Sequence, residues 1–185
     1  KELSDEDRTK LQAWAVRISK QTDRINAIVQ RLRRFGRPGS QRQLFSICDA
    51  IREALMVTET TTREAVDDLN VDCADNLAFV HADRIQIEQV LVNLIGNACD
   101  AMKSVQKGQR EIMIRAVEDE QMVTVRVSDT GPGIPADHEK EVFDMFVTSK
   151  PEGMGMGLAI SRSIIEAHGG KICCVTGDSG GQFEF

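Results

Sequence analysis

Several features that would assign the chain to a common class of protein are missing from its 185 residues. There is no secretory signal peptide and no apolar run long enough to span a membrane. The five cysteines are odd in number and show neither CxxC spacing nor a four-residue zinc pattern. We therefore expect a soluble cytoplasmic piece with reduced thiols, in which any membrane attachment of the full-length protein would come from segments absent here.

Two common phosphate-binding loops are missing as well. No GxxxxGK(S/T) sequence occurs anywhere in the chain. The one cluster of alternate glycines, at 153–157, does not follow a strand immediately, as the dinucleotide-binding fingerprint requires. If the chain binds a nucleotide, it does so through neither of these loops.

Charge is divided unevenly along the chain. Residues 1–42 contain 11 Lys and Arg against 5 Asp and Glu, a net charge of +6, so the remainder must carry −12 to give the overall −6. An acidic globular part argues against general nucleic-acid binding. A basic coiled-coil arm for nucleic acid is an alternative for the first segment, but aromatic residues are not interleaved with its basic ones.

The same segment predicts one long helix over residues 1–37. Apolar residues recur at spacings of three and four from Leu11 to Phe35, an a/d heptad seam with one polar position at Gln21. A lone helix cannot bury such a stripe, so we expect it to pair with other helices. A linker over residues 38–43, which begins with Pro-Gly-Ser, ends the helix.

The rest of the chain, residues 44–185, mixes helical and strand-like patterns. We expect helices near 46–58, 83–105 and 158–168, strand-like pieces near Asn70 and at 77–80, a hairpin over 111–128 that turns near Asp119, and two short strands at the end. Helices on one face of a mixed sheet give a two-layer α/β (α+β) sandwich.

The run NLIGNACDAM at 93–102 places two amides on one face of the second of these helices. Asn93 and Asn97 are four residues apart, so their side chains point the same way, and Asp100 falls in the same narrow sector. The neighbouring sector is apolar. An amide at the border of an apolar stripe is a neutral oxygen ligand that suits Mg²⁺ already bound to phosphate. An amphipathic surface helix rich in amides is the alternative.

The segment VTVRVSDTGPGI at 123–134 directs a carboxylate into the core. Three valines and Asp129 share one face of a strand at period two. A buried carboxylate needs hydrogen-bond donors, and the exocyclic amine of adenine would serve. Gly131 and Gly133 would let the backbone turn sharply and approach a flat ligand. An ordinary strand end followed by a Gly-Pro-Gly turn is the alternative.

Two later segments, VFDMFVTSK at 142–150 and GMGMGLAIS at 153–161, bring a lysine next to the glycine cluster. Phe143 and Phe146 are spaced for one face of a short helical turn, as core residues often are. Lys150 lies in a loop just ahead of the glycines, from which it can reach a phosphate as a point charge. Free backbone N–H groups at the start of the following helix would form a phosphate site.

Together, the four segments resemble the N, G1, F and G2 boxes of the ATP-binding catalytic domain of bacterial sensor histidine kinases. The resemblance covers about residues 44–185, and the run TSKPEGMGMGLAISRSIIEAHGG is most similar to the nitrogen-regulation and oxygen-sensing subgroup. It implies the Bergerat nucleotide-binding fold, with ATP and Mg²⁺ held between the amide helix and a lid over about 143–157. Residues 1–37 would then be the second helix of the dimerisation and histidine-phosphotransfer hairpin, and the protein a homodimer.

The resemblance implies a role at each matching position. Asn97 would coordinate Mg²⁺, with Asn93 contacting the metal or the phosphates, and Asp129 would bind the adenine amine. Lys150 would reach the terminal phosphates, which the lid glycines would cover. The full set expected to bind the nucleotide is Asn93, Asn97, Asp100, Asp129, Gly131, Gly133, Ile134, Phe146, Thr148, Ser149, Lys150, Gly153, Met154, Gly155, Met156, Gly157 and Leu158.

Members of this family transfer the γ-phosphoryl of Mg-ATP to a histidine, and from there to an aspartate of a response-regulator receiver domain. The accepting histidine normally lies on the first helix of the hairpin, followed by an acidic residue and, a few positions later, a proline. His81, His138 and His168 do not occur in that context. We therefore expect the phosphoacceptor histidine outside this chain and no catalytic residue within it.

Two departures from the family pattern and two alternative functions bear on this interpretation. Met156 replaces the usual leucine of the G2 box, a volume-conserving change, and Gln182 replaces a small residue, which puts in doubt a water contact behind the adenine.

An ATP-hydrolysing conformational machine of the same fold would need a glutamate, as general base, where Asn93 stands. A scaffold that has lost nucleotide binding would not need the intact Asn97, Asp129 and lid glycines.

Overall fold

The computed structural model describes residues 41–74, 77–119, 122–139, 141–148, 150, 153–175 and 180–185. The helix predicted for 1–37, the first part of the linker and Ser149 lie outside these residues. Gln41–Phe185 belong to one folded unit. In the described ranges, no helix has both the length and the apolar character needed to cross a membrane.

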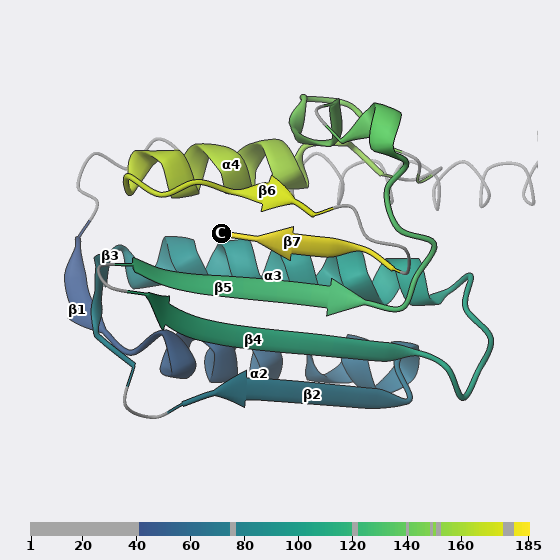
Figure 1. Cartoon of the computed structure of the whole chain (residues 1–185), viewed down its shortest axis with the longest axis horizontal. Helices are drawn as coiled ribbons and strands as arrows, with labels where there is room; N and C mark the ends of the chain where they lie inside the picture. The colour runs from purple at the N-terminus through teal and green to yellow at the C-terminus, as the bar shows by residue number, and fades with distance from the viewer. Residues whose placement is uncertain are drawn as a thin grey trace, which may run out of the picture. The chain divides into compact units, whose positions relative to one another are not determined.

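A five-stranded mixed sheet forms one layer of this unit (Figure 1). The neighbouring strands β2 (Asp68–Cys73) and β4 (Glu111–Asp119) run parallel, and each of the other neighbouring pairs is antiparallel. A separate two-stranded antiparallel ladder joins β1 (Gln43–Phe45) to β3 (Val80–Ala82). In spatial order, the strands of the large sheet are β2 (Asp68–Cys73), β4 (Glu111–Asp119), β5 (Met122–Asp129), β7 (Gln182–Glu184) and β6 (Cys173–Cys174).

Helices α2 (Ile47–Ala65), α3 (Arg84–Met102) and α4 (Gly157–Ala167) form the second layer, on one face of the sheet (Figure 1). α3 begins after Asp83, whose Oδ1 accepts a hydrogen bond from the Gln86 N–H at 3.3 Å and so caps the helix. α3 packs against both α2 and α4, which makes it the central helix of the layer. Two short 3₁₀ helices, η1 (Ala136–His138) and η2 (Glu141–Phe143), lead from the sheet towards the lid.

Alternation along the strands decides which side chains enter the core. Ile112 and Ile114 of β4 are fully buried, and the register sets them opposite Asp129 and Val127 of β5. Burial of each isoleucine side chain contributes roughly 1.5–3 kcal/mol. Asp129 therefore occupies, at the end of β5, an inward position of the kind that apolar residues fill elsewhere in the sheet.

The two-layer sandwich confirms the predicted fold class, but α2 is longer than predicted. We expected the helix to end near Thr58, where the sequence becomes rich in threonine, and it continues to Ala65. The hydroxyl of Thr58 donates to the Ala54 carbonyl at 2.8 Å, and that of Thr62 donates to the Thr58 carbonyl at 2.5 Å. Because these hydroxyls bond within the helix, both threonines can extend its buried stripe.

Two strand boundaries also differ from prediction. Gln43, which we placed in the linker, is the first residue of β1. The strand expected at 77–80 is β3, which begins only at Val80 and ends at Ala82. Three-residue strands such as these are held by pairing with each other, so their limits depend on a partner more than 30 positions away in the sequence.

The prediction that all five cysteines are reduced is wrong for one pair. Cys48, in the first turn of α2, forms a disulfide with Cys73, the last residue of β2, and their Cα atoms lie 5.9 Å apart. The chain runs along α2 and returns along β2, which brings the start of the helix to the end of the strand. Cys99, Cys173 and Cys174 are free thiols, as expected.

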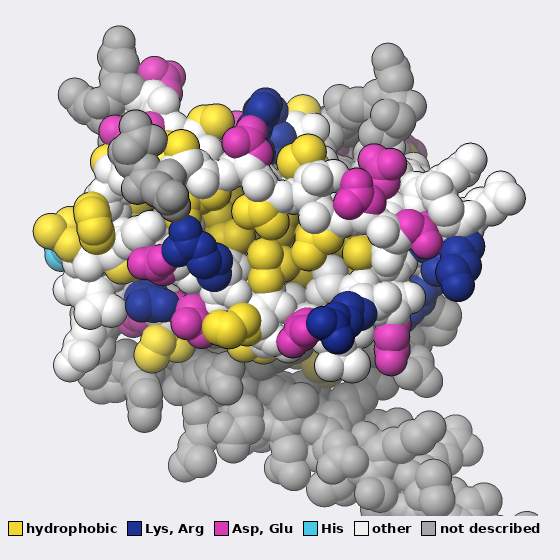
Figure 2. Space-filling view, turned by 90° about the horizontal axis from the view of Figure 1, so that it is seen from below, with side chains coloured by type: hydrophobic (Ala, Val, Ile, Leu, Met, Phe, Trp, Pro, Cys, Tyr) yellow, Lys and Arg dark blue, Asp and Glu magenta, His cyan; other side chains and the backbone are white. Residues whose placement is uncertain are grey.

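Apolar side chains are exposed at the edge of the sheet formed by β2. Figure 2 shows apolar side chains gathered between charged ones on the side of the molecule seen from below, where Figure 1 places β2 and α2. The exposed apolar residues of these two elements are Met56, Val57 and Val71. No residue expected to bind the nucleotide belongs to α2 or β2, so this surface is separate from the predicted site.

Candidate nucleotide-binding site

The carboxylate of Asp129 is buried, as its strand position predicts. Its Oδ1 accepts hydrogen bonds from the backbone N–H groups of Gly131 at 2.8 Å and Gly181 at 3.1 Å. Burial raises the pKa of Asp129 above its ordinary value, and these two hydrogen bonds offset only part of that effect. Within the described ranges no donor reaches Oδ2, so that oxygen can accept a hydrogen bond from a ligand amine.

The turn after β5 lies between the end of α3 and the chain that enters β7. A side chain at Gly131 would collide with Ala101 of α3, and the chain at Gly133 passes close to the carbonyl of Gly180. The hydroxyl of Thr130 anchors the turn, because it donates to the Gln109 carbonyl at 2.7 Å and accepts from the Glu111 N–H at 3.0 Å. The predicted glycine turn therefore forms one end of a site beside α3.

The lysine of the lid reaches the amide helix. The ammonium of Lys150 donates to Oδ1 of Asn97 at 2.8 Å and to Oδ2 of Asp100 at 2.6 Å. Asn97 and Asp100 are three residues apart on α3, so their oxygens face the same side. Three residues that we predicted to bind the nucleotide are thus brought together, and the predicted metal ligand already holds a cationic group.

Asp100 binds a second cation on its other oxygen. Lys103 lies 2.7 Å from Oδ1 of Asp100 on the exposed surface of α3. Burial by itself raises the pKa of Asp100, but the hydrogen bonds and positive charges of Lys103 and Lys150 outweigh it and hold this pKa below its ordinary value. An ionised carboxylate beside an amide oxygen is a donor pair that a hard divalent cation such as Mg²⁺ prefers.

Asn93 faces α4 rather than Lys150. Its Nδ2 donates to Oγ of Ser161 at 3.0 Å, and Ser161 is almost completely buried. Its Oδ1 lies against Gly157, where any side chain would overlap the amide. The two amides share a helix face, as predicted, but in this structure Asn93 joins α3 to α4 while Asn97 binds the lysine.

The F-box and G2-box segments fold onto each other to form the lid. The Phe146 N–H donates to the Gly155 carbonyl at 2.8 Å, and the Gly153 N–H donates to the Lys150 carbonyl at 3.0 Å. Gly155 has a φ of 62°, and a side chain there would collide with the backbone of Phe146 and Val147. The glycines therefore allow a close backbone contact that places Lys150 over α3.

The two phenylalanines of the lid segment do not share a face, which corrects our prediction. Phe143, at the end of η2, is buried and packs edge-to-face on Phe183, with ring centroids 6.1 Å apart. The side chain of Phe146 is 74% exposed, and the residue has a φ of 71°. The helical turn ends at Phe143, and the left-handed backbone at Phe146 directs its N–H towards Gly155.

The remaining predicted residues lie in the glycine turn, in the lid and at the start of α4. Ile134, Met154, Met156 and Leu158 are half-buried, and Thr148 is exposed, with its hydroxyl accepting the Lys150 N–H at 3.1 Å. α4 begins at Gly157, and its N-cap residue, Met156, provides no side-chain acceptor. The first N–H groups of the helix are therefore available to a phosphate.

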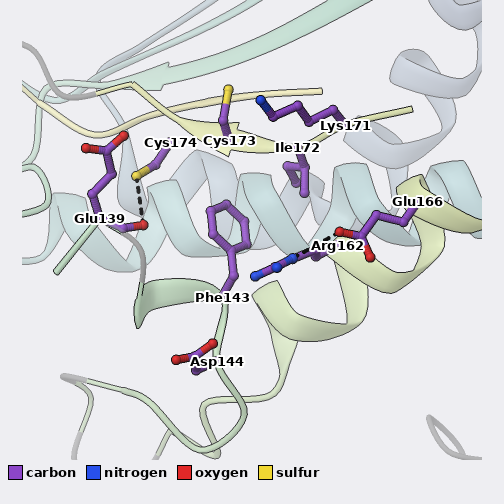
Figure 3. A pocket seen from close by; sticks show the side chains of 9 residues that line it. All are labelled: Glu139, Phe143, Asp144, Arg162, Glu166, Lys171, Ile172, Cys173 and Cys174. Carbon is purple, nitrogen blue, oxygen red and sulfur yellow. Dashed lines mark hydrogen bonds and ion pairs between the residues drawn. The ribbon is translucent and has the colours of Figure 1, made fainter. Parts of the chain in front are cut away.

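A separate hollow of about 480 Å³ lies between η2, α4 and β6 (Figure 3). Phe143 and Ile172 line it, and at its edge Arg162 pairs with Glu166 at 3.1 Å. None of the residues expected to bind the nucleotide lines this hollow. It is therefore distinct from the site along α3.

Sequence reasoning missed three residues that shape the site. Gly181 donates to Asp129, Ser161 holds Asn93, and Thr130 anchors the glycine turn. The Gly-Gly pair before β7 was a signal for the first of these, since a glycine often marks a close backbone approach. Ser161 and Thr130 gave no signal, because their partners come from other segments of the chain.

Comparison with known proteins identifies the family. A family model described as "Histidine kinase-, DNA gyrase B-, and HSP90-like ATPase" matches residues 82–185. The sensor protein FixL of Bradyrhizobium diazoefficiens is 39% identical over 179 residues, which cover 96% of this chain and 35% of FixL. The chain thus spans about a third of the length of that relative.

Solved structures agree with this assignment. The catalytic domain of histidine kinase ThkA, in a nucleotide-free form, aligns with a TM-score of 0.69 at 34% identity and covers 78% of this chain and 93% of that domain. ThkA in complex with the response regulator protein TrrA aligns with a TM-score of 0.73 at 28% identity, over 99% of this chain and 52% of that one. The chain therefore belongs to the histidine kinase-, DNA gyrase B- and HSP90-like ATPase family, and within it to the ATP-binding catalytic domains of sensor histidine kinases.

Proposed function

We propose that the chain binds Mg²⁺·ATP along α3 and holds the γ-phosphoryl group for transfer to a histidine outside these 185 residues. The observation that supports this is the convergence of separate segments on Asn93–Met102, which spans about 14 Å at 1.5 Å per residue. Gly157 lies against the start of this stretch, Lys150 binds its middle, and Gly131 lies against its end. A nucleotide lying along α3 would contact all of these segments.

Asp129 would bind the adenine at one end of this stretch. Its Oδ1 is occupied by two backbone N–H groups, which leaves Oδ2 for the exocyclic amine of adenine. Because the position is buried, water competes weakly for this hydrogen bond. The charge of the carboxylate favours an amine over a carbonyl at that position of the base, which would distinguish adenine from guanine.

Asn97 and Asp100 would hold the Mg²⁺, because their oxygens form a donor pair that already binds an ammonium group. Among the described residues, no group of three or more His, Cys, Asp or Glu could hold a metal alone. Phosphate oxygens and water would therefore complete the six ligands that Mg²⁺ requires. The bound metal would neutralise charge on the phosphates.

Lys150 and the start of α4 would bind the phosphates. Lys150 supplies a positive charge on a flexible stem, and the uncapped first turn of α4 supplies free N–H groups with the positive end of the helix dipole. The lid backbone between them would exclude water from the γ-phosphate. These groups position the phosphoryl and stabilise its charge, which is the main protein contribution to phosphoryl transfer.

The accepting histidine would come from elsewhere. His168 has both ring nitrogens engaged, since Nε2 accepts from the Asp83 N–H at 3.0 Å and Nδ1 lies 2.8 Å from the Ile164 carbonyl. His81 lies in β3 and His138 in η1. None of the three lies on a helical hairpin. We infer that the phosphoryl acceptor belongs to a hairpin whose second helix is residues 1–37.

This hairpin would also pair two copies of the protein, and the phosphoryl group would pass on to a receiver domain. The heptad seam of residues 1–37 supports the homodimer. The complex of ThkA with the response regulator protein TrrA supports a receiver-domain partner. The similarity to ThkA extends over 99% of this chain and 52% of the ThkA chain.

Nucleotide binding is tested with a fluorescent ATP analogue. Asn97→Ala and Asp129→Ala should each abolish binding while the circular dichroism spectrum stays that of the folded chain. Asn70→Ala, an exposed asparagine on β2, is the matched control and should bind normally. Wild-type affinity in either site variant contradicts the proposal.

The reaction itself is tested with radiolabelled ATP and a separately made phosphoacceptor hairpin. Label on the histidine of the hairpin supports the kinase, and free phosphate released by the chain alone supports an ATPase. We expect the first result, because the amide of Asn93 cannot act as a general base and is bound to Ser161.

A further inference from the structure

We propose that Lys150 and the nucleotide-bound Mg²⁺ exchange places at Asn97, a role for the lysine that rests on the proposed function. Without nucleotide, the ammonium occupies the position of the metal between Asn97 and Asp100. When Mg²⁺ arrives with its phosphates, it takes Oδ1 of Asn97, and the ammonium moves onto a phosphate oxygen.

Electrostatic repulsion disfavours the presence of both cations at Asn97. The ammonium of Lys150 lies 2.8 Å from Oδ1 of Asn97, and a Mg²⁺ ligated by the same oxygen would lie about 2.0–2.1 Å from it. The two positive charges would then be at most about 5 Å apart, on opposite sides of one oxygen, where like charges repel. Binding of the metal therefore favours departure of the ammonium.

The ammonium of Lys150 is bound firmly enough to occupy the position between Asn97 and Asp100, but weakly enough for Mg²⁺ to displace it. It bonds to Asn97 and to the ionised Asp100 at once, so two oxygens share its charge. The side chains of Lys150 and Asp100 are 40% and 35% exposed, so water screens their attraction. A divalent cation that brings its own phosphate ligands competes favourably with such a pair.

The exchange would also move the lid. The backbone of Lys150 bonds to both sides of the lid, with its N–H donating to Oγ1 of Thr148 at 3.1 Å and its carbonyl accepting the Gly153 N–H at 3.0 Å. The ion pair to Asp100 therefore fastens the lid to α3 before nucleotide binds. Release of the ammonium would free this attachment at the moment when phosphates arrive to replace it.

Lys103 provides a matched control for Lys150. Both lysines bind Asp100 at nearly the same distance, 2.7 Å and 2.6 Å, but only Lys150 contacts Asn97. Lys103 is 77% exposed and belongs to the end of α3 rather than to the lid. We therefore compare Lys150→Met with Lys103→Met. A change in nucleotide binding caused only by the loss of positive charge near Asp100 would appear in both variants, whereas a change caused by exchange at Asn97 would appear only in Lys150→Met.

The first experiment measures ADP affinity by calorimetry, once with EDTA and once with saturating Mg²⁺. ADP is used because it has no γ-phosphate, which removes the contact that Lys150 is expected to make with the terminal phosphate of ATP. The dissociation constant in EDTA divided by that in Mg²⁺ reports how strongly metal and nucleotide binding are coupled. In Lys150→Met we expect this ratio to be about threefold to fivefold larger than in the wild type, because Mg²⁺ no longer displaces an ammonium.

In Lys103→Met the ratio should equal that of the wild type. A ratio in Lys150→Met that is unchanged or smaller overturns the exchange and leaves the proposed function intact. Failure of the wild-type chain to bind ADP at all overturns the proposed function, and the exchange with it.

The second experiment needs no nucleotide. Hydrogen–deuterium exchange at the N–H groups of Phe146 and Gly153, which are bonded within the lid, reports how firmly the lid is held. Lys150→Met and Asp100→Asn should speed this exchange several-fold, and Lys103→Met should not. Equal exchange rates in all variants overturn the attachment of the lid by Lys150.

Discussion

Nδ2 of Asn93 donates a hydrogen bond to Oγ of Ser161 at 3.0 Å, although the two residues are 68 positions apart in the sequence. The bond joins the middle of α3, which carries the amides, to α4, whose first turn faces the lid. Ser161 is only 1% exposed, so its hydroxyl has little access to water as an alternative partner. The relative position of these two helices, and hence of Asn97 and the phosphate-binding turn, depends on this contact.

Removal of the Ser161 hydroxyl should therefore weaken the domain. In Ser161→Ala the Nδ2 of Asn93 loses its partner at a partly buried contact, which costs about 1–2 kcal/mol of unfolding free energy. Urea unfolding measures this loss. Ser163→Ala, an exposed serine two positions further along the same helix, should change stability by less than about 0.5 kcal/mol. Equal stabilities of the two variants would show that the contact with Asn93 is unimportant.

Two glycines of the site region should respond in opposite ways to alanine. At Gly157 a methyl group would overlap the amide of Asn93, so Gly157→Ala should destabilise the chain and weaken ATP binding at least tenfold. At Gly96, in the middle of α3, a methyl group would meet nothing within 4 Å. Gly96→Ala should therefore raise the unfolding free energy by about 0.5–1 kcal/mol.

Thermal unfolding and titration with a fluorescent ATP analogue measure both effects. The two substitutions are chemically identical, so the difference between them isolates the close approach at Gly157 from the general preference of helices for alanine. Stabilisation by both would mean that α4 can move away from Asn93 at little cost.

Local patterns were sufficient to predict the main elements that carry the site. Asp129 was placed correctly because strand alternation depends only on neighbours two residues away, and Asn93 and Asn97 because helix periodicity does the same. Lys150 and the lid glycines were recognised from composition, as a lysine in a loop just ahead of a glycine cluster. The contacts among these segments were not accessible from the residues alone, and their order along the chain indicated them only through the family resemblance.

The errors at the cysteines and at Phe146 share a physical cause, which is pairing between segments that are separate in the sequence. Cys48 and Cys73 are 25 positions apart, and only the return of the chain from α2 to β2 brings them together. Phe146 leaves the face of Phe143 because its N–H bonds to Gly155, in a later segment. α2 was predicted to be too short because the inward-facing hydroxyl of Thr62 is satisfied by the helix itself, which composition does not show.

Reduction of the disulfide should lower stability without abolishing nucleotide binding. The bond between Cys48 and Cys73 closes a loop of about 25 residues, and the loss of that constraint in the unfolded chain costs about 3 kcal/mol. Urea unfolding with and without dithiothreitol measures the difference. The double variant Cys48→Ala, Cys73→Ala should unfold identically in both conditions. A wild-type chain indifferent to the reductant would show that the bond does not form in solution.

Asp129 should lower the stability of the folded chain near neutral pH while it serves adenine recognition, and this loss of stability should depend on pH. Burial raises the pKa of this carboxyl in the folded chain, while in the unfolded chain it keeps an ordinary value of about 3.9. The folded state therefore binds the proton more tightly. The stability that this group contributes is fully present below the ordinary value and is lost as the pH rises through the raised one.

The variant Asp129→Asn removes this dependence while keeping an oxygen for the N–H groups of Gly131 and Gly181. We expect this variant to be more stable than the wild type at pH 7 and to bind ATP at least tenfold more weakly. The difference in unfolding free energy should narrow as the pH falls through the raised pKa of Asp129 towards the ordinary value. Urea unfolding at several pH values measures this difference, and Asp137→Asn, at a 79% exposed position, should parallel the wild type throughout. A difference that stays constant with pH would mean that Asp129 is ionised at no cost in the folded chain, and its burial would then provide no driving force for capturing an amine.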